Sequence, residues 1–199
     1  NNVTTNPYLL TDLTAGTSYN VWVRSVCGGA LGNGSWTGPV TFTTKCVATI
    51  VPYIQDFNEA IVPALPNCTA ETKIGFGSNW QTTIANTNHG YDSQYLLYRG
   101  NITEPANAWF FTQGISLEAG KSYTISYKYG SNTNAAITGN NLKVSYGTGD
   151  TPSDMTLPLA DYKFYYGYAT NVSVNFVAPT SDVYYFGFNA YSFPAQGNM

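Results

Sequence analysis

The stretch Tyr123-Thr124-Ile125-Ser126-Tyr127-Lys128-Tyr129 places a large apolar or aromatic residue at every second position. Because successive side chains of a β-strand point to opposite faces, this period of two predicts a strand with one buried face. Three later segments, residues 142–146, 172–177 and 183–188, alternate in the same way and end near Gly, Asn or Pro residues. No window carries a sustained helical period. Short strands separated by turn residues predict an all-β sandwich.

The composition excludes several classes of protein. Charged residues make up 10% of the 199 residues, against about 25% in an average protein. The sequence has seventeen tyrosines and little charge, whereas a disordered chain has few aromatic residues and much charge. A net charge of −3 argues against a nucleic-acid partner, and no apolar run reaches the roughly 18 residues of a membrane span. This composition is typical of extracellular or cell-surface β-modules.

The three cysteines predict one disulfide. Cys27, Cys46 and Cys68 form no CxxC pair, and a single histidine leaves zinc without a ligand set. An extracellular location favours a disulfide, and Cys46 and Cys68 lie 22 residues apart on either side of a strand expected to start at Tyr53. Cys27 is then free or paired outside this chain. The alternative is three buried thiols that act as small hydrophobes.

A domain boundary is predicted near residues 45–52. A strand over residues 40–44 precedes it, and the next strand is expected from Tyr53. We therefore expect a first domain at residues 1–45, a linker at 46–52 and a second domain at 53–199. The first piece is too short to bury a sandwich core on its own.

The N-terminal piece contains the run Leu10-Thr11-Asp12-Leu13-Thr14-Ala15-Gly16-Thr17-Ser18-Tyr19-Asn20-Val21-Trp22-Val23-Arg24. This run resembles the C-terminal half of a fibronectin type III module. Tyr19 matches the tyrosine corner, whose hydroxyl bonds to the upstream backbone. The resemblance covers residues 8–44 and implies a partial sandwich, the last three strands of seven.

The second piece opens with the run Pro52-Tyr53-Ile54-Gln55-Asp56-Phe57-Asn58. Further motifs follow in order at residues 65–68, Trp80, and residues 109–117, 119–123, 142–149 and 184–192. Together they resemble the MAM-like jelly-roll modules of bacterial cleaved adhesins, found in surface proteins of the Bacteroidetes. The resemblance implies a jelly-roll β-sandwich without the family's closing strand. It also implies adhesion at the cell surface and export by the type IX secretion system, with the outer-membrane secretion machinery as a partner.

The same resemblance implies a structural Ca²⁺, a hard cation that takes oxygen ligands. Asn58 stands at the matching position after Phe57, and Glu59 and Asp92 are the other candidate ligands. The alternative is that the acidic residues are ordinary solvated carboxylates.

Catalysis is not expected. A nucleophilic triad needs a base, and the only histidine, His89, lies in the turn-like run Asn86-Thr87-Asn88-His89-Gly90, where we expect a solvated loop. The glycine-rich run 75–78 lacks the lysine of a phosphate-binding loop. Eleven acidic residues leave a glycosidase-type carboxylate pair open, but none lies in a recognisable motif.

Aromatic rings make glycan binding a candidate function, because sugar faces stack on exposed rings. The run Asp161-Tyr162-Lys163-Phe164-Tyr165-Tyr166-Gly167-Tyr168 places tyrosines on both faces of a strand. Tyr162, Tyr165 and Tyr166 are the candidate stacking residues, against the alternative of plain sheet packing. Trp36 is a further candidate, which the fibronectin resemblance places at the end of a sheet. Trp80 and Trp109 are expected in the core.

These observations together predict a non-catalytic adhesin fragment, secreted or at the cell surface, that binds a surface glycan or an extracellular protein. The alternative is a structural spacer, or an accessory module of a large secreted protein or hydrolase.

Overall fold

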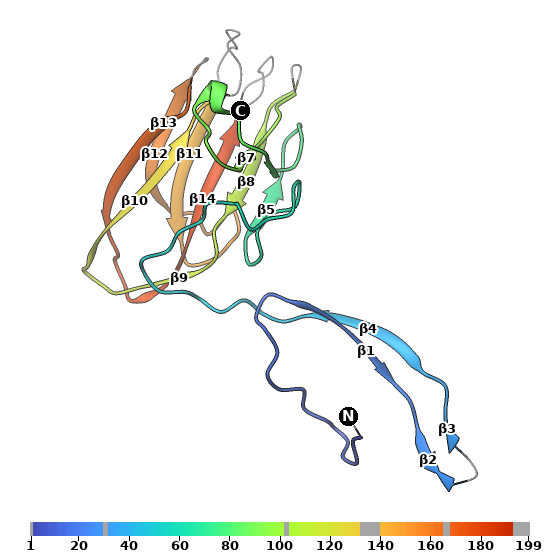
Figure 1. Ribbon diagram of the computed structural model, residues 1–199. Helices are drawn as coiled ribbons and strands as arrows, with labels where there is room; N and C mark the ends of the chain where they lie inside the picture. The colour runs from blue at the N-terminus through green and yellow to red at the C-terminus, as the bar shows by residue number, and fades with distance from the viewer. Residues whose placement is uncertain (1, 30–31, 102–103, 132–139, 165–167, 193–199) are drawn as a thin grey trace. The chain divides into compact units, whose positions relative to one another are not determined.

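The computed structural model describes residues 2–29, 32–101, 104–131, 140–164 and 168–192. The chain divides into two units, Asn1–Val47 and Ala48–Met199, and each is described by itself. Apart from one 3-10 turn at Thr87–His89, the regular structure of the described residues consists of β-strands (Figure 1). The prediction of an all-β protein is confirmed.

Unit 1 consists of two short antiparallel ladders. β1 (Ser18–Val23) pairs with β4 (Thr37–Thr43), and β2 (Val26–Gly28) pairs with β3 (Gly32–Asn33). Tyr19 lies opposite Phe42, and their rings stack with centroids 5.9 Å apart.

Each unit contains a tyrosine corner. The hydroxyl of Tyr19 accepts a hydrogen bond from the backbone N–H of Thr14 at 2.9 Å, as expected from the sequence. In unit 2 the hydroxyl of Tyr123 accepts one from the N–H of Glu118, also at 2.9 Å. Both tyrosines follow a turn with the sequence Ala-Gly-x-Ser, in which the glycine has a positive φ that suits glycine best. The same local sequence therefore builds the same turn in both units.

The larger layer of unit 2 is a six-stranded antiparallel sheet with β14 near its centre. In spatial order its strands are β12 (Leu157–Phe164), β11 (Asn140–Gly147), β14 (Asp182–Tyr191), β8 (Asn107–Phe111) and β5 (Ala70–Lys73), with β9 (Ile115–Leu117) beside the start of β14.

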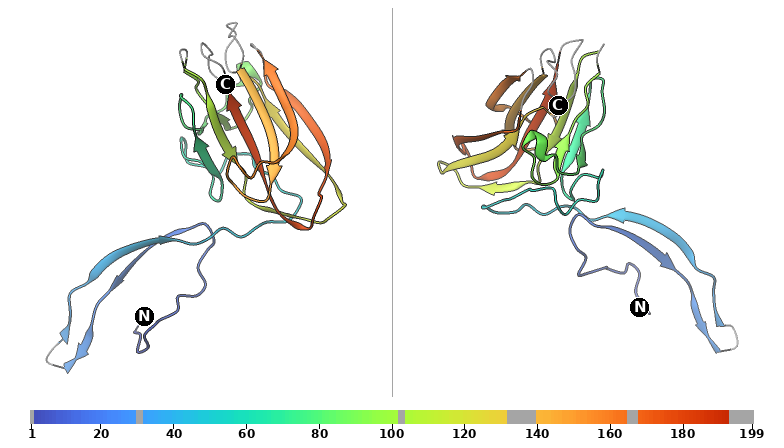
Figure 2. Two further views of the ribbon diagram at one scale, coloured as in Figure 1. Left: turned by 180° about the vertical axis from the view of Figure 1, so that it is seen from behind. Right: turned by 45° about the horizontal axis from the view of Figure 1, so that its top comes forward.

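The remaining strands form two separate ladders. β10 (Ser122–Tyr129) pairs with β13 (Thr170–Val177) over eight residues, and β6 (Gln81–Thr83) pairs with β7 (Tyr95–Leu97). The β10–β13 ladder lies over one face of the large sheet (Figure 2). In the part of the chain that is described, no backbone pairing joins the two ladders.

The main core lies between the large sheet and the β10–β13 ladder. Tyr184 and Phe186 of β14 are 1% and 4% exposed and pack with Tyr146 and Phe176. Full burial of each such side chain contributes about 1.5–3 kcal/mol. The alternation read from residues 183–188 therefore placed these two side chains correctly.

Both tryptophans expected in the core of unit 2 pack against other aromatic rings. Trp109 is buried on the opposite face of the large sheet, where its ring stacks on Phe111 at 5.8 Å. Trp80 is half-buried beside Tyr98 at 5.6 Å, and its Nε1 donates to the carbonyl of Ala108 at 3.0 Å.

The strand predicted to start at Tyr53 is absent, so that prediction is wrong. Residues 51–57 form no ladder, and only Thr49, before them, makes a single parallel bridge, with Ile115. Pro52 has no N–H to donate to a ladder, and Phe57 has a φ of 64°, outside the strand region.

The predicted disulfide between Cys46 and Cys68 is confirmed, and Cys27 is an exposed free thiol. Among the described residues, no helix is long and apolar enough to cross a membrane.

Candidate binding groove

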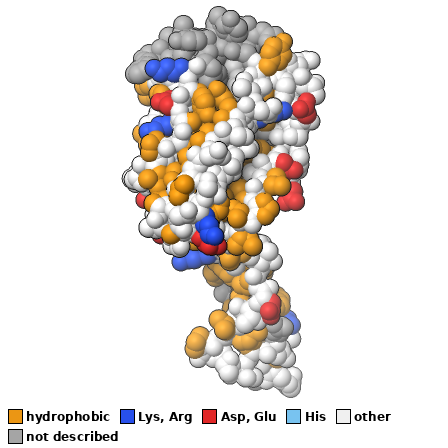
Figure 3. All heavy atoms as spheres, turned by 90° about the vertical axis from the view of Figure 1, so that its left-hand side faces the viewer, with side chains coloured by type: hydrophobic (Ala, Val, Ile, Leu, Met, Phe, Trp, Pro, Cys, Tyr) orange, Lys and Arg blue, Asp and Glu red, His pale blue; other side chains and the backbone are white. Residues whose placement is uncertain are grey.

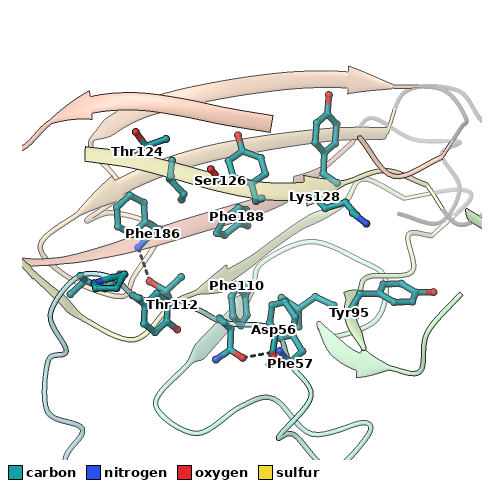
Figure 4. A pocket seen from close by; sticks show the side chains of 18 of the residues that line it. Asp56, Phe57, Tyr95, Phe110, Thr112, Thr124, Ser126, Lys128, Phe186 and Phe188 are labelled. Carbon is teal, nitrogen blue, oxygen red and sulfur yellow. Dashed lines mark hydrogen bonds between the residues drawn. The ribbon is translucent and has the colours of Figure 1, made fainter. Parts of the chain in front are cut away.

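Unit 2 contains a cavity of about 820 Å³, within the range of typical ligand sites. Strand β10 forms one wall, residues 51–57 and β7 contribute to the opposite wall, and the large sheet forms the floor (Figure 4). We call this cavity the β10 groove. Hydrophobic side chains gather in a band along the side of unit 2 on which β10 and β13 lie (Figure 3).

The floor of the β10 groove is aromatic. Phe110 from β8 and Phe186 and Phe188 from β14 line it. Phe110 and Phe186 are buried, but Phe188 is only half-buried although β14 is an inner strand of the sheet. The Phe188 ring contacts Tyr127 of β10 at 5.4 Å, so the described residues cover this part of the sheet only in part.

The β10 wall repeats the alternation seen in the sequence. Ile125 and Tyr127 are half-buried, whereas Thr124 and Ser126 are exposed on the other face. The exposed pair is bonded to β13; for example, the Thr124 hydroxyl donates to Asn175 Oδ1 at 2.7 Å. The inward positions line the groove, and Thr124, Ser126 and Lys128 of the other row also border it (Figure 4).

Three tyrosines cluster around the far end of this wall. The hydroxyls of Tyr127 and Tyr162 share a hydrogen bond of 2.8 Å, and the rings of Tyr129 and Tyr162 stack at 4.3 Å. Burial raises the pKa of Tyr127 and of Tyr129 above the ordinary value, and in Tyr127 the hydrogen bond to Tyr162 adds to the rise. These hydroxyls therefore stay protonated and can donate a hydrogen bond at any physiological pH.

Tyr162, predicted as a glycan-stacking residue, is half-buried in β12 with one ring partner already in place. Its stacking role stays a prediction. Tyr165 and Tyr166, the other two candidates, lie outside the described residues.

The opposite wall also carries paired tyrosines. The rings of Tyr91 and Tyr95 stack at 4.2 Å with an interplanar angle of 17°, and both line the groove. Burial is the main cause that raises the pKa of Tyr91, and the neighbouring Tyr95 adds to the rise. Nearby, Gln55 Oε1 accepts a hydrogen bond from the N–H of Phe57 at 3.0 Å. This wall therefore carries both an amide group and aromatic rings.

One ion pair links the two walls. The Lys128 ammonium on β10 lies 3.3 Å from Asp92 Oδ2 and donates to the carbonyl of Gly90 at 2.8 Å. The two charged side chains are 35% and 77% exposed, and an ion pair this exposed contributes about 0–1 kcal/mol. The link is therefore weak, and it lies toward the Tyr129 end of β10.

Of the three predicted calcium ligands, Asp92 lines the β10 groove and Asn58 and Glu59 do not, and each has a different environment. Asn58 Oδ1 accepts a hydrogen bond from the N–H of Gln94 at 3.3 Å, Asp92 is paired with Lys128, and Glu59 is exposed. Within the described ranges, no three His, Cys, Asp or Glu side chains cluster as metal ligands. As arranged, with an ammonium beside Asp92, these residues do not fit a calcium cage. Calcium binding stays a prediction, which thermal melts with calcium and with a chelator would check.

His89 ends the 3-10 turn at Thr87–His89 and lies in the turn that the sequence predicted. Its Nδ1 is 3.2 Å from Asn86 Oδ1. The Nε2 atom is buried without a hydrogen-bond partner in the described part of the chain, so the side chain is less solvated than expected.

Trp36, the further aromatic candidate, belongs to unit 1. It is 61% exposed, and the Arg24 guanidinium carbon lies 4.6 Å from the centre of its ring. This cation–π contact occupies one face of the ring.

Sequence reasoning missed the β10 groove as a site. It placed Tyr123, Ile125, Tyr127 and Tyr129 on one face of a strand but identified no site there, and it sought exposed rings near residues 161–168. The two nearby tyrosines Tyr91 and Tyr95 were a signal in the sequence that could have indicated this site. The sequence could not show that a covering strand is absent, because a sequence pattern does not show which strands become neighbours.

The solved structures that resemble the chain include the following two. The K1 cleaved adhesin domain of Lys-gingipain from Porphyromonas gingivalis W83 is 18% identical, with a TM-score of 0.53 over 72% of this chain and 90% of that domain. A carbohydrate-binding module of the β-sandwich superfamily is 12% identical, with a TM-score of 0.43 over 92% of this chain and 70% of that chain. The first likeness supports an adhesin-like β-sandwich fold. No family model and no curated protein matches the chain.

Proposed function

We propose that this chain is a non-catalytic binding module of an extracellular or cell-surface protein, and that it recognises a surface glycan or protein through the β10 groove. The observation that carries this proposal is the groove itself: a cavity of about 820 Å³ with an aromatic floor and polar groups at its rim.

The chemistry of the groove favours binding. Concave sites of this size that combine apolar surface with a few polar groups are the usual sites of ligand recognition. The rim supplies Asp56, Gln94 and the Lys128–Asp92 pair, and the walls supply tyrosine rings and hydroxyls. Tyrosines bring a large contact area and a hydrogen-bonding group at the same time.

Two further observations support an extracellular location. The Cys46–Cys68 disulfide is of a kind that persists in oxidising compartments. The fold is also shared with a cleaved adhesin domain of a gingipain.

A glycan array and a panel of extracellular proteins, probed with the 199-residue chain, would test this proposal. Ser93 is exposed at the rim of the groove, and its hydroxyl makes only a local contact with the carbonyl of Gln94 at 3.4 Å. The variant Ser93→Trp should block the groove without disturbing the core. Ser153→Trp is the matched control, because Ser153 is an exposed serine of unit 2 that does not line the groove.

We expect a ligand whose affinity falls at least about tenfold, or about 1.4 kcal/mol, in Ser93→Trp and is unchanged in Ser153→Trp. Equal binding by the two variants would move the site away from the groove. Failure of every glycan and protein to bind would favour the spacer instead.

A further inference from the structure

Strand β10, which forms one wall of the groove, has an unpaired edge. It pairs with β13 along one edge, from Ser122 opposite Val177 to Tyr129 opposite Thr170. Along its other edge, residues 122–128 have no backbone hydrogen-bond partner within the described residues. At about 3.3 Å per residue, this edge presents a row of amide and carbonyl groups roughly 20 Å long. Such a row is a template for another strand.

A second strand edge borders the same groove. β7 pairs with β6 and with no other strand of the described chain, and Tyr95 and Leu96 of β7 line the groove. Two-stranded ladders are marginally stable alone. A strand laid in the groove would extend the β10–β13 ladder toward β7 and cover the large sheet between them.

The floor matches one face of such a strand. Phe188 on β14 and Ile125 on β10 are half-buried at the groove, so they still expose apolar surface. A strand directs every second side chain to one face. Alternate apolar side chains would cover Phe188 and Ile125, and the side chains between them would face solvent.

We propose that the β10 groove takes an extended polypeptide strand, with apolar side chains at alternate positions, that hydrogen-bonds to the free edge of β10. This inference rests on the proposed binding function and names its ligand class. Strand addition uses the repeated main-chain donors and acceptors of a sheet edge and gains specificity from alternate side chains. A glycan can stack on the tyrosines but has no such repeat to pair with β10. Because Lys128 already bridges to Asp92, the strand lies along residues 122–127.

Synthetic peptides of roughly eight residues, a usual strand length, would test this with the intact chain. The first alternates valine with threonine or lysine, and the second has the same composition with its valines together. Two further peptides carry the alternating sequence with every second backbone amide N-methylated. In one the odd-numbered amides are methylated and in the other the even-numbered amides, so that each peptide loses the N–H groups of one strand edge. Affinity is measured by titration calorimetry, and amide hydrogen exchange in residues 122–128 is followed by NMR.

We expect the alternating peptide to bind and to slow hydrogen exchange in residues 122–127. The second peptide, a scrambled sequence of the same composition, should bind at least about tenfold more weakly because its valines no longer alternate. At least one N-methylated peptide should also bind at least about tenfold more weakly, because each lost hydrogen bond contributes about 0.5–1.5 kcal/mol. Ser93→Trp should weaken binding, and Ser153→Trp should leave it unchanged.

Equal affinity for the alternating peptide and both N-methylated peptides would overturn strand pairing, as would equal affinity for the scrambled one. If the alternating peptide does not bind while a glycan or folded protein binds in a manner sensitive to Ser93→Trp, the strand inference fails and the proposed function stands. If no ligand of any kind binds, both fail.

Discussion

At the scale of single residues, tyrosine hydroxyls tie turns and strands together. Tyr123 fixes the turn before β10 by accepting the Glu118 N–H, just as Tyr19 does for Thr14 in unit 1. The sequence was sufficient to predict the corner at Tyr19, because the contact is local. The pairing of Tyr127 with Tyr162 joins strands 35 residues apart, and no local pattern predicts it.

The variant Tyr123→Phe should lower the free energy of unfolding of unit 2 by about 1 kcal/mol, the usual net value of one hydrogen bond. Urea unfolding followed by tryptophan fluorescence would measure the change. Tyr168→Phe is the control, because Tyr168 is 64% exposed. Equal stability of the two variants would show that the Tyr123 corner contributes nothing.

The tyrosines also predict how stability depends on pH. The pKa of Tyr191 is raised from 10.0 to about 12. Burial is the largest cause, and the Asp161 carboxylate, which accepts the Tyr191 hydrogen bond at 2.7 Å, is the second. In this range the unfolded chain loses the proton first, so the contribution of Tyr191 is complete below pH 10 and disappears as the pH rises toward 12. The free energy of unfolding should therefore fall between these pH values, and it should fall less in Tyr191→Phe. Urea unfolding at stepped pH checks this, and equal slopes in the two proteins would contradict it.

At the scale of elements, the period of two predicted β10, β11, β13 and β14 because each has one face toward a core. The prediction failed at residues 51–57, where the composition is that of a strand but no partner strand pairs with them. It also found the row of alternating residues on one face of β10 but not the groove that part of this row borders. Both points depend on which strands become neighbours, a property of the whole sheet and not of any one segment.

The disulfide is the covalent link between elements, and it closes a loop of 22 residues. Cross-linking a loop of this length should stabilise the folded chain by about 3 kcal/mol. The double variant Cys46→Ser, Cys68→Ser should lose about that much in urea unfolding, whereas Cys27→Ser should match the wild type because Cys27 is a free exposed thiol. An equally stable double variant would show that the cross-link adds nothing.

At the scale of the molecule, unit 2 is an antiparallel sandwich in which one layer is a continuous sheet and the other is divided around a groove. The half-buried Phe188, the paired tyrosines and the free edge of β10 all border that groove. We therefore regard the groove as the functional centre of the chain. Low charge and a disulfide suit such a module to work outside the cell.

The most direct test of this claim is an NMR map of backbone amide shifts when the strongest ligand from the glycan, protein and peptide panels is added to the chain. We predict that the shifts concentrate at residues 122–128, 51–57 and 91–96, which border the groove. Shifts confined to unit 1, or to the face of the large sheet that carries Trp109, would contradict it.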